Sequence, residues 1–148
     1  MMRVLIVEDD FLSRRMLQRF LAPYGECDIA VNGKEALQAF NISWIEKQPY
    51  DLICLDIMMP EMNGHQALAA IRQAEAEGNP AHHTGYPPVK IIITTARNDH
   101  QSVATAMKSK CEAYLIKPLS KKTLLDKLCS LGLIAPQETT GPDPDSLV

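Results

Sequence analysis

Four short apolar runs without polar alternation constrain the fold of this chain more than any other feature. They are "VLIV" (4–7), "LICL" (52–55), "IIIT" (91–94) and "AYLI" (113–116), and a weaker fifth run is "CDIAV" (27–31). Such runs are typical of strands that are buried on both faces, as in a parallel sheet. The chain therefore has to supply helices that cover both faces of that sheet.

Helical patterns fill the segments between the apolar runs. Apolar side chains recur there at spacings of three and four residues, as on the buried face of a helix. The segments are 11–22, 33–46, 64–77, 99–110 and 119–131. Strands that alternate with helices predict an α/β fold of the (βα)5 type, doubly wound, with a five-stranded parallel sheet.

The 148 residues are enough for one domain with its own hydrophobic core. We expect that domain to span residues 1–133. The final segment, 134–148, has the composition of a disordered tail. The tail residues Glu138, Asp143 and Asp145 account for the net charge of −3, so the body is close to neutral. This balance argues against a nucleic-acid-binding module.

Three features that the sequence lacks guide our expectations about cellular location and membrane contact. No apolar run approaches the length of a membrane span, so we expect no membrane contact. No signal peptide precedes the first run, which is followed at once by Glu8. The four cysteines lie far apart and form no CxxC pair, which excludes a zinc or redox motif of that kind. We expect a cytoplasmic protein.

Polar residues follow the apolar runs at the points where the strands would end. They are Glu8, Asp9 and Asp10 after the first strand, Asp56 after the third, Thr94 and Thr95 after the fourth, and Lys117 after the fifth. In open parallel sheets, the functional crevice lies beyond the carboxyl ends of the strands. Carboxylates gathered at that edge repel one another, and Mg²⁺ relieves such repulsion through oxygen ligands.

This residue set suits phosphoryl chemistry. A carboxylate can accept a phosphoryl group as an aspartyl phosphate, and the transfer depends on positioning and on stabilisation of charge. A metal, a lysine ammonium and a hydroxyl group would supply that stabilisation. Taken singly, these residues have ordinary explanations, because acids cap helices, threonine favours strands and Lys-Pro forms turns. Their occurrence in order, each after a different strand, favours a shared site.

The motifs "VLIVEDD", "LDIMMPEMNG", "IIITTA" and "YLIKP" occur in an order that resembles the receiver domain of two-component response regulators. The resemblance covers about residues 2–131. It implies the flavodoxin-like strand order 2-1-3-4-5. Two departures are a lysine, Lys110, where the family often has a glycine, and a long connection, 77–88, with His82 and His83. We expect both histidines to be surface residues.

The resemblance also implies roles for individual residues. Asp56 is expected to be the phosphoryl acceptor. The expected Mg²⁺ ligands are Asp9, Asp56, the backbone carbonyl of Met58 and, mainly through water, Glu8. The alternative acid pair is Asp9 and Asp10; Glu8 and Asp9 are favoured because they directly follow the last apolar residue of the strand. Gly64 is expected to let the chain turn into the next helix.

The same resemblance implies a switch around the acceptor. Thr95 matches the hydroxyl that closes on the phosphoryl group, and Lys117 matches the lysine that pairs with its oxygens. Tyr114 matches the aromatic residue that changes its rotamer when the threonine moves, and the resemblance implies that this changes the surface formed by the fourth helix, fifth strand and fifth helix. The peptide bond between Lys117 and Pro118 is expected to be cis. Met58 and Arg97 lie two residues beyond Asp56 and Thr95 and offer no base to orient water, so we predict slow autodephosphorylation.

The expected function is that of a phosphoprotein in a two-component phosphorelay. A sensor histidine kinase or a histidine phosphotransfer protein would donate the phosphoryl group, and the chain would not otherwise be an enzyme. No DNA-binding helix-turn-helix follows residue 131, so we expect a stand-alone receiver like those of chemotaxis. One alternative is a degenerate receiver that acts as a binding scaffold. Another is a phosphatase with an aspartate nucleophile. Such enzymes usually have a second aspartate two residues after the nucleophile, and this chain has Met58 at that position.

Overall fold

The structure, a computed structural model, describes residues 2–59, 62–78, 86–96 and 111–136. Within these ranges, five strands form one sheet in the order β2-β1-β3-β4-β5, and every neighbouring pair is parallel. The strands are β1 (Met2–Val7), β2 (Gly25–Ala30), β3 (Leu52–Asp56), β4 (Lys90–Thr95) and β5 (Ala113–Ile116). The predicted α/β fold and strand order are confirmed.

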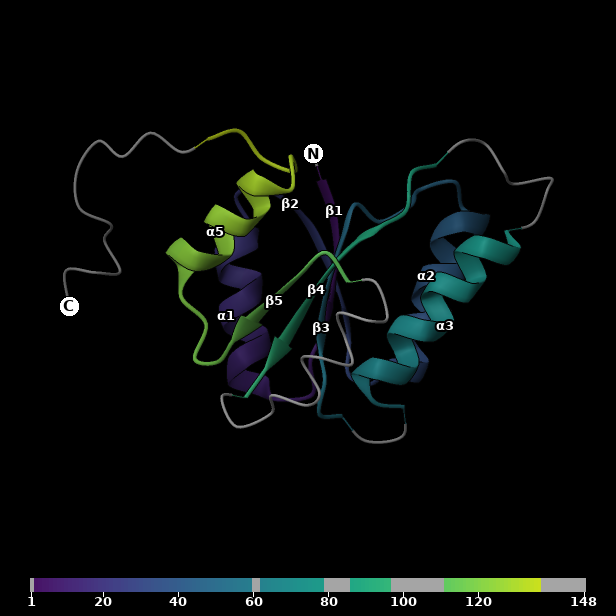
Figure 1. Cartoon of the computed structure of the whole chain (residues 1–148), viewed down its shortest axis with the longest axis horizontal. Helices are drawn as coiled ribbons and strands as arrows, with labels where there is room; N and C mark the ends of the chain where they lie inside the picture. The colour runs from purple at the N-terminus through teal and green to yellow at the C-terminus, as the bar shows by residue number, and fades with distance from the viewer. Residues whose placement is uncertain (1, 60–61, 79–85, 97–110, 137–148) are drawn as a thin grey trace.

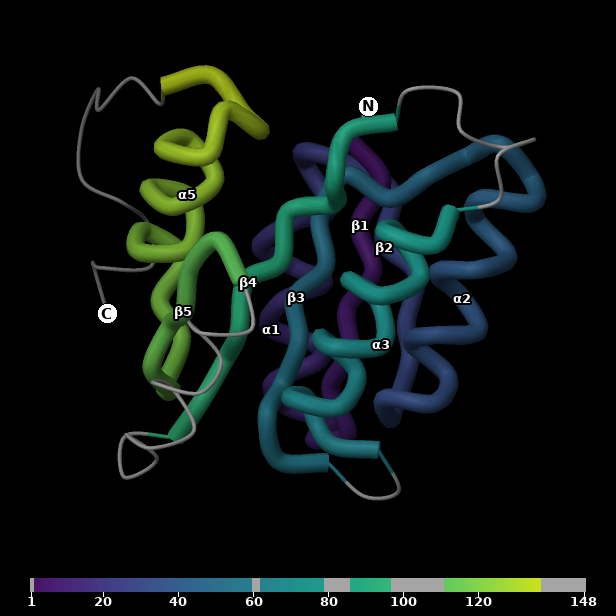
Figure 2. Tube along the Cα trace, turned by 45° about the vertical axis from the view of Figure 1, so that its right-hand side comes forward, coloured from purple at the N-terminus to yellow at the C-terminus, as the bar shows by residue number. Residues whose placement is uncertain are grey.

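Helices cover both faces of the sheet. The helices of the described ranges are α1 (Phe11–Leu21), α2 (Gly33–Ile45), α3 (Gly64–Glu77) and α5 (Lys121–Ser130). Figure 1 shows α1 and α5 on one face of the sheet and α2 and α3 on the other, and Figure 2 shows α2 beside α3. The helix predicted over 99–110 lies outside the described residues. None of the described helices is long and apolar enough to cross a membrane.

Burial of both faces explains why the apolar runs lack alternation. All five residues of β3 are buried. Leu52 and Cys54 pack in the core beneath α1 and α5, whereas Ile53 and Leu55 pack in the core beneath α2 and α3. Successive side chains of a strand point to opposite faces, so a central strand must be apolar at every position.

The β2 strand departs from its predicted bounds of 27–31. It begins two residues earlier, at Gly25, and ends at Ala30. As an edge strand it pairs only with β1, and it carries the exposed acids Glu26 and Asp28. Polar residues are tolerated on such an edge, so the apolar signal there is weak.

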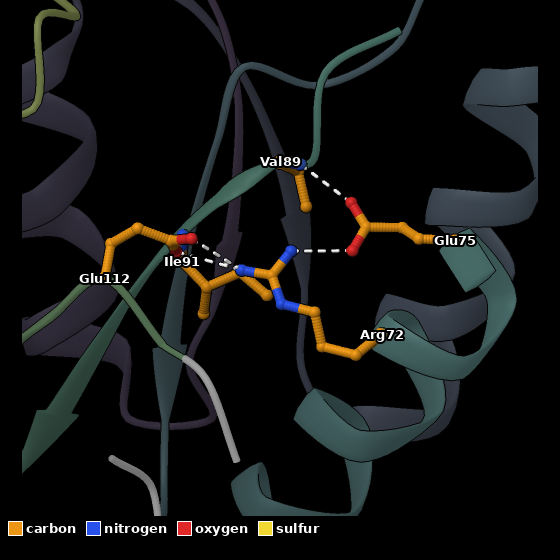
Figure 3. Close-up of polar contacts among 5 residues, drawn as sticks. All are labelled: Arg72, Glu75, Val89, Ile91 and Glu112. Carbon is orange, nitrogen blue, oxygen red and sulfur yellow. Dashed lines mark hydrogen bonds and ion pairs between the residues drawn. The ribbon is translucent and has the colours of Figure 1, made fainter. Parts of the chain in front are cut away.

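A polar network ties α3 to the start of β4 and to the residue before β5 (Figure 3). Arg72 Nη2 donates to both carboxylate oxygens of Glu112 at 2.9 Å, and its Nη1 lies 2.6 Å from Glu75 Oε1. The two glutamates in turn accept backbone N–H groups, Glu75 from Val89 at 2.7 Å and Glu112 from Ile91 at 2.5 Å. Paired in this way, the charges hold the amino-terminal end of β4 in place, opposite the edge where the strands finish.

Candidate functional site

The carboxyl ends of the parallel strands meet at one edge of the sheet, which is the lower edge in Figure 1. Glu8 directly follows β1, Asp56 is the last residue of β3, Thr95 is the last residue of β4, and Lys117 directly follows β5. The backbone N–H of Glu8 donates to the carbonyl of Ala30 at 3.0 Å, which continues the ladder between β1 and β2. The site is thus built on the rigid end of the sheet.

Three carboxylates lie together at this edge. One oxygen each from Glu8, Asp9 and Asp56 lies within 4.8 Å of the others. Glu8 is fully buried, Asp56 is 4% exposed, and Asp9 is exposed to solvent. Buried carboxylates in such a group repel, and their oxygen atoms are the ligands that a hard divalent cation prefers. This donor set fits Mg²⁺.

The third acid of the motif has a different role. Asp10 caps α1, because its Oδ2 accepts the backbone N–H of Ser13 at 2.9 Å. That hydrogen bond lowers the pKa of Asp10. The helix-cap explanation therefore applies to Asp10, while Glu8 and Asp9 belong to the acid cluster.

Lys117 contributes a positive charge to the site. Its Nζ lies 2.6 Å from Glu8 Oε1 and 3.5 Å from Asp56 Oδ1, so its closer partner is Glu8. Burial acts to lower the pKa of Lys117, but the hydrogen bond to Glu8 and the charges of both acids outweigh it and raise that pKa. The Lys117 backbone N–H donates to the carbonyl of Thr95 at 2.7 Å, and the peptide bond to Pro118 is cis.

The acidity of Asp56 is strongly changed by its surroundings. Burial raises the pKa of Asp56 from 3.8 to about 7, and the hydrogen bond and charge of Glu8 act in the same direction. The Lys117 charge and the backbone N–H of Met58, 3.4 Å from Asp56 Oδ1, lower it in part. In the metal-free protein, Asp56 is therefore held in an environment that disfavours its ionised form.

The substitution Asp56→Asn is expected to stabilise the metal-free protein more at pH 8 than at pH 5. Because the pKa of Asp56 is raised on folding, the folded state keeps a proton that the unfolded state releases between about pH 4 and 7. Stability therefore falls as pH rises through that window, and an amide removes this loss. Denaturant midpoints of both proteins in a chelator, at the two pH values, measure it. Equal gains at both pH values would contradict the expectation.

The remaining predicted site residues lie around this cluster. Thr95 is buried and its hydroxyl donates to the carbonyl of Ala96 at 3.3 Å. Tyr114 is 37% exposed on β5, and the Met58 side chain is exposed beside Asp56. Arg97 lies outside the described residues. The structure thus brings together Glu8, Asp9, Asp56 and Lys117, and it positions Thr95 one residue past the neighbour of Asp56 on β4.

Gly64 has a role that sequence reasoning missed. A Cβ atom at this position would lie 2.4 Å from the carbonyl oxygen of Asp56 and 2.7 Å from the Cα of Ile57. Among the described glycines, the one with a positive φ is Gly132, so Gly64 is needed for close approach and not for a left-handed turn. Its backbone N–H also donates to the Ile57 carbonyl at 2.9 Å, which holds the start of α3 against the end of β3.

Comparison with known proteins gives consistent results. A family model described as "Response regulator receiver domain" matches residues 4–129. The chemotaxis protein CheY of Thermotoga maritima is 31% identical over 128 residues, which cover 85% of this chain and 93% of that protein. The chain spans between 12% and 27% of the length of the first curated relatives that it matches.

Solved structures share the fold. One is a co-crystal of the Saccharomyces cerevisiae histidine phosphotransfer signaling protein Ypd1 and the receiver domain of Ssk1. Its TM-score is 0.73 at 26% identity, with 95% of this chain and 97% of that chain covered. Another is the CheX–CheY–BeF3–Mg complex of Borrelia burgdorferi, with a TM-score of 0.71 at 25% identity and coverage of 88% and 89%.

The family explains the residues gathered at the sheet edge. Receiver domains are signalling modules of two-component systems and are generally not enzymes, and the acid cluster of Glu8, Asp9 and Asp56 could hold a metal ion. The chain belongs to the response regulator receiver domain family.

Proposed function

We propose that this chain accepts a phosphoryl group on Asp56 from a phosphohistidine, with Mg²⁺ held by Asp9, Asp56, the Met58 carbonyl and Glu8. The observation that supports this most is the cluster of Glu8, Asp9 and Asp56 with the Lys117 ammonium beside it. The magnesium and beryllofluoride named for the Borrelia burgdorferi CheY complex are consistent with this assignment.

In the proposed reaction, an Asp56 oxygen forms a bond to phosphorus as the donor's N–P bond breaks. The electron pair of that bond returns to the histidine nitrogen, so the step is a balanced transfer between two nucleophiles. Bound Mg²⁺ supplies charge stabilisation to the phosphoryl oxygens. Lys117 is half-buried and charged, so it can turn from Glu8 toward the new phosphoryl oxygens without a change in protonation. Thr95 would donate its hydroxyl to the same oxygens.

Incubation with acetyl phosphate tests the proposal without a partner protein. With Mg²⁺ present, we expect the mass of one phosphoryl group to be added per chain and to map to Asp56. With a chelator in place of Mg²⁺, the negative charges of the acid cluster are not neutralised and repel the incoming phosphoryl group, so we expect no phosphoryl group to be added. Labelling that ignores the metal, or that maps to another residue, would refute the assignment. An absence of labelling under all conditions would favour the scaffold alternative.

The donor would dock beside the site on α1. The described part of α1 presents three exposed apolar side chains, Phe11 (60% exposed), Leu12 (71%) and Met16 (38%), and it begins directly after the Asp10 cap. Apolar surface of this kind at the mouth of a site marks a protein contact. The donor must bring its phosphohistidine to Asp56, and the Ypd1–Ssk1 complex is a precedent for a histidine phosphotransfer protein as partner.

Leu12→Glu is expected to slow phosphoryl transfer from a histidine phosphotransfer protein at least tenfold, and to leave labelling by acetyl phosphate unchanged. A buried charge in the docked complex is unfavourable, whereas the small donor needs no docking surface. Ile45→Glu on α2 is a matched control, because Ile45 is exposed to a similar extent (68%) but lies away from the acid edge. Equal transfer rates for both variants would rule out α1 as the docking surface.

Phosphorylation would then signal through protein contact. Thr95 would move toward the phosphoryl group and the exposed Tyr114 would follow, which changes the surface around β5 and α5. We also propose a long-lived phosphoryl group, since the exposed Met58 side chain offers no base to orient water. We also propose a cytoplasmic location for these steps.

A further inference from the structure

Thr94 is the direct neighbour of the acceptor on the next strand. In the parallel register of β3 and β4, Asp56 pairs with Thr94, and the Ile57 N–H donates to the Thr94 carbonyl at 3.2 Å. The pair two residues earlier in this register, Cys54 and Ile92, packs in the core beneath α1 and α5. Because side chains alternate along a strand, Asp56 and Thr94 lie on that same face, and Thr95 lies on the opposite one.

The Thr94 hydroxyl is buried without a hydrogen bond. Thr94 is 1% exposed, and within the described part of the chain its Oγ1 and His65 Nδ1 are the buried side-chain polar atoms that have no partner. A buried hydroxyl in this state destabilises the folded protein, and such groups are rare in native structures. Valine has nearly the same shape and would fill the position without this penalty.

The neighbouring Asp56 carboxylate shares a hydrogen bond with Glu8, and its contacts at Oδ1 are long. The Asp56 Oδ1 atom lies 3.4 Å from the Met58 nitrogen and 3.5 Å from the Lys117 ammonium, at the long limit of hydrogen bonding. By contrast, Lys117 is only 2.6 Å from Glu8. On adjacent strands, a buried hydroxyl without a partner therefore lies beside a carboxylate oxygen whose contacts are long.

We propose that Thr94 is a positioning residue for the acceptor, whose hydroxyl donates a hydrogen bond to the Asp56 carboxylate when that group accepts a phosphoryl group. This inference rests on the proposed function. Adjacent strands are about 4.8 Å apart, so rotation about χ1 brings a threonine hydroxyl within reach of a carboxylate on the same face. The bond would hold one carboxylate oxygen as the other attacks phosphorus, after Lys117 turns to the phosphoryl oxygens. Orientation of this kind speeds transfer.

Thr94→Val and Thr94→Ser test the role. We expect Thr94→Val to fold with an unchanged or higher denaturation midpoint, because it removes an unpartnered buried hydroxyl. Its maximal labelling rate at saturating acetyl phosphate and Mg²⁺ should fall about tenfold, as for the loss of one hydrogen bond to a charged group. Thr94→Ser keeps the hydroxyl and should restore most of the rate, which a purely structural role does not predict.

Ile92→Val provides a control on the same strand and face. It removes one methylene from the core, so it should lower the denaturation midpoint and leave the labelling rate as in the wild type. If Thr94→Val labels at the wild-type rate while wild type is phosphorylated on Asp56, the role of Thr94 is refuted and the proposed function stands. If Thr94→Ser is as slow as Thr94→Val, the hydroxyl is not responsible and the role is likewise refuted. A wild-type chain that accepts no phosphoryl group overturns both proposals.

Discussion

Asp56→Asn is expected to abolish phosphoryl incorporation from acetyl phosphate and Mg²⁺. Asparagine keeps the size of the side chain, but its amide is a poor nucleophile and cannot form the acyl phosphate. It also removes one of the three clustered carboxylates, so the metal site loses a ligand and a negative charge. The expected result is labelling at background level, measured by intact mass or by radiolabelled phosphoryl donor over several hours.

The fold of this variant should be intact, which separates lost chemistry from lost structure. Lys117 keeps its 2.6 Å partner Glu8, so the substitution leaves no buried charge unpaired. Asp126→Asn on α5 is a matched control, since it removes a carboxylate that is 71% exposed and weakly paired. That control should label like the wild type. Full labelling of Asp56→Asn would place the acceptor elsewhere.

The fold could be predicted because central parallel strands must be apolar at every position. This requirement gives unbroken runs at the central strands β1, β3 and β4, and the intervening spacings of three and four give the helices. The edge strand β2 shows the limit of the signal. It pairs on one side only, tolerates the exposed acids Glu26 and Asp28, and so its bounds were predicted two residues late at its start.

The membership of the site could also be predicted, because carboxyl ends of parallel strands converge. Glu8, Asp9, Asp56 and Lys117 are each within one or two residues of a strand end, and the structure brings them together. The ion pairs within the site could not be predicted from the sequence. Whether Lys117 turns to Glu8 or to Asp56 depends on side-chain lengths and burial that no spacing reveals, and the raised pKa of Asp56 depends on the same packing.

The sequence likewise could not show which buried polar groups lack a hydrogen-bond partner. "TT" at a strand end fits β propensity equally well at both positions. Only the register shows that Thr94 is the neighbour of Asp56, and only the packed core shows that its hydroxyl has no partner. The need for glycine at position 64 is of the same kind, since it arises from contact between the start of α3 and the end of β3.

Gly64→Ala is expected to destabilise the protein by about 3 kcal/mol, at the upper end of the range for overpacking. The added methyl carbon would lie 2.4 Å from the Asp56 carbonyl oxygen and 2.7 Å from the Ile57 Cα. Both are backbone atoms, of Asp56 and of the residue after it, so no side chain can move aside to make room. Either α3 shifts outward or the peptide after Asp56 moves. Denaturant unfolding, monitored in wild type and variant, measures the loss.

The same substitution should slow phosphoryl acceptance in the molecules that remain folded. Displacement of the peptide after Asp56 would move both the acceptor and the Met58 carbonyl, and a misplacement of about 1 Å can reduce a rate about 100-fold.

Gly132→Ala separates this effect from stability. Gly132 has a φ of 76° and nothing within 4 Å of an added Cβ, so alanine there should cost about 1 kcal/mol through backbone strain alone. Because Gly132 follows the end of α5, which points away from the edge of the sheet that carries the acid cluster (Figure 1), its variant should label at the wild-type rate. If Gly64→Ala and Gly132→Ala have equal labelling rates under conditions in which both are fully folded, the contact between α3 and β3 does not position Asp56.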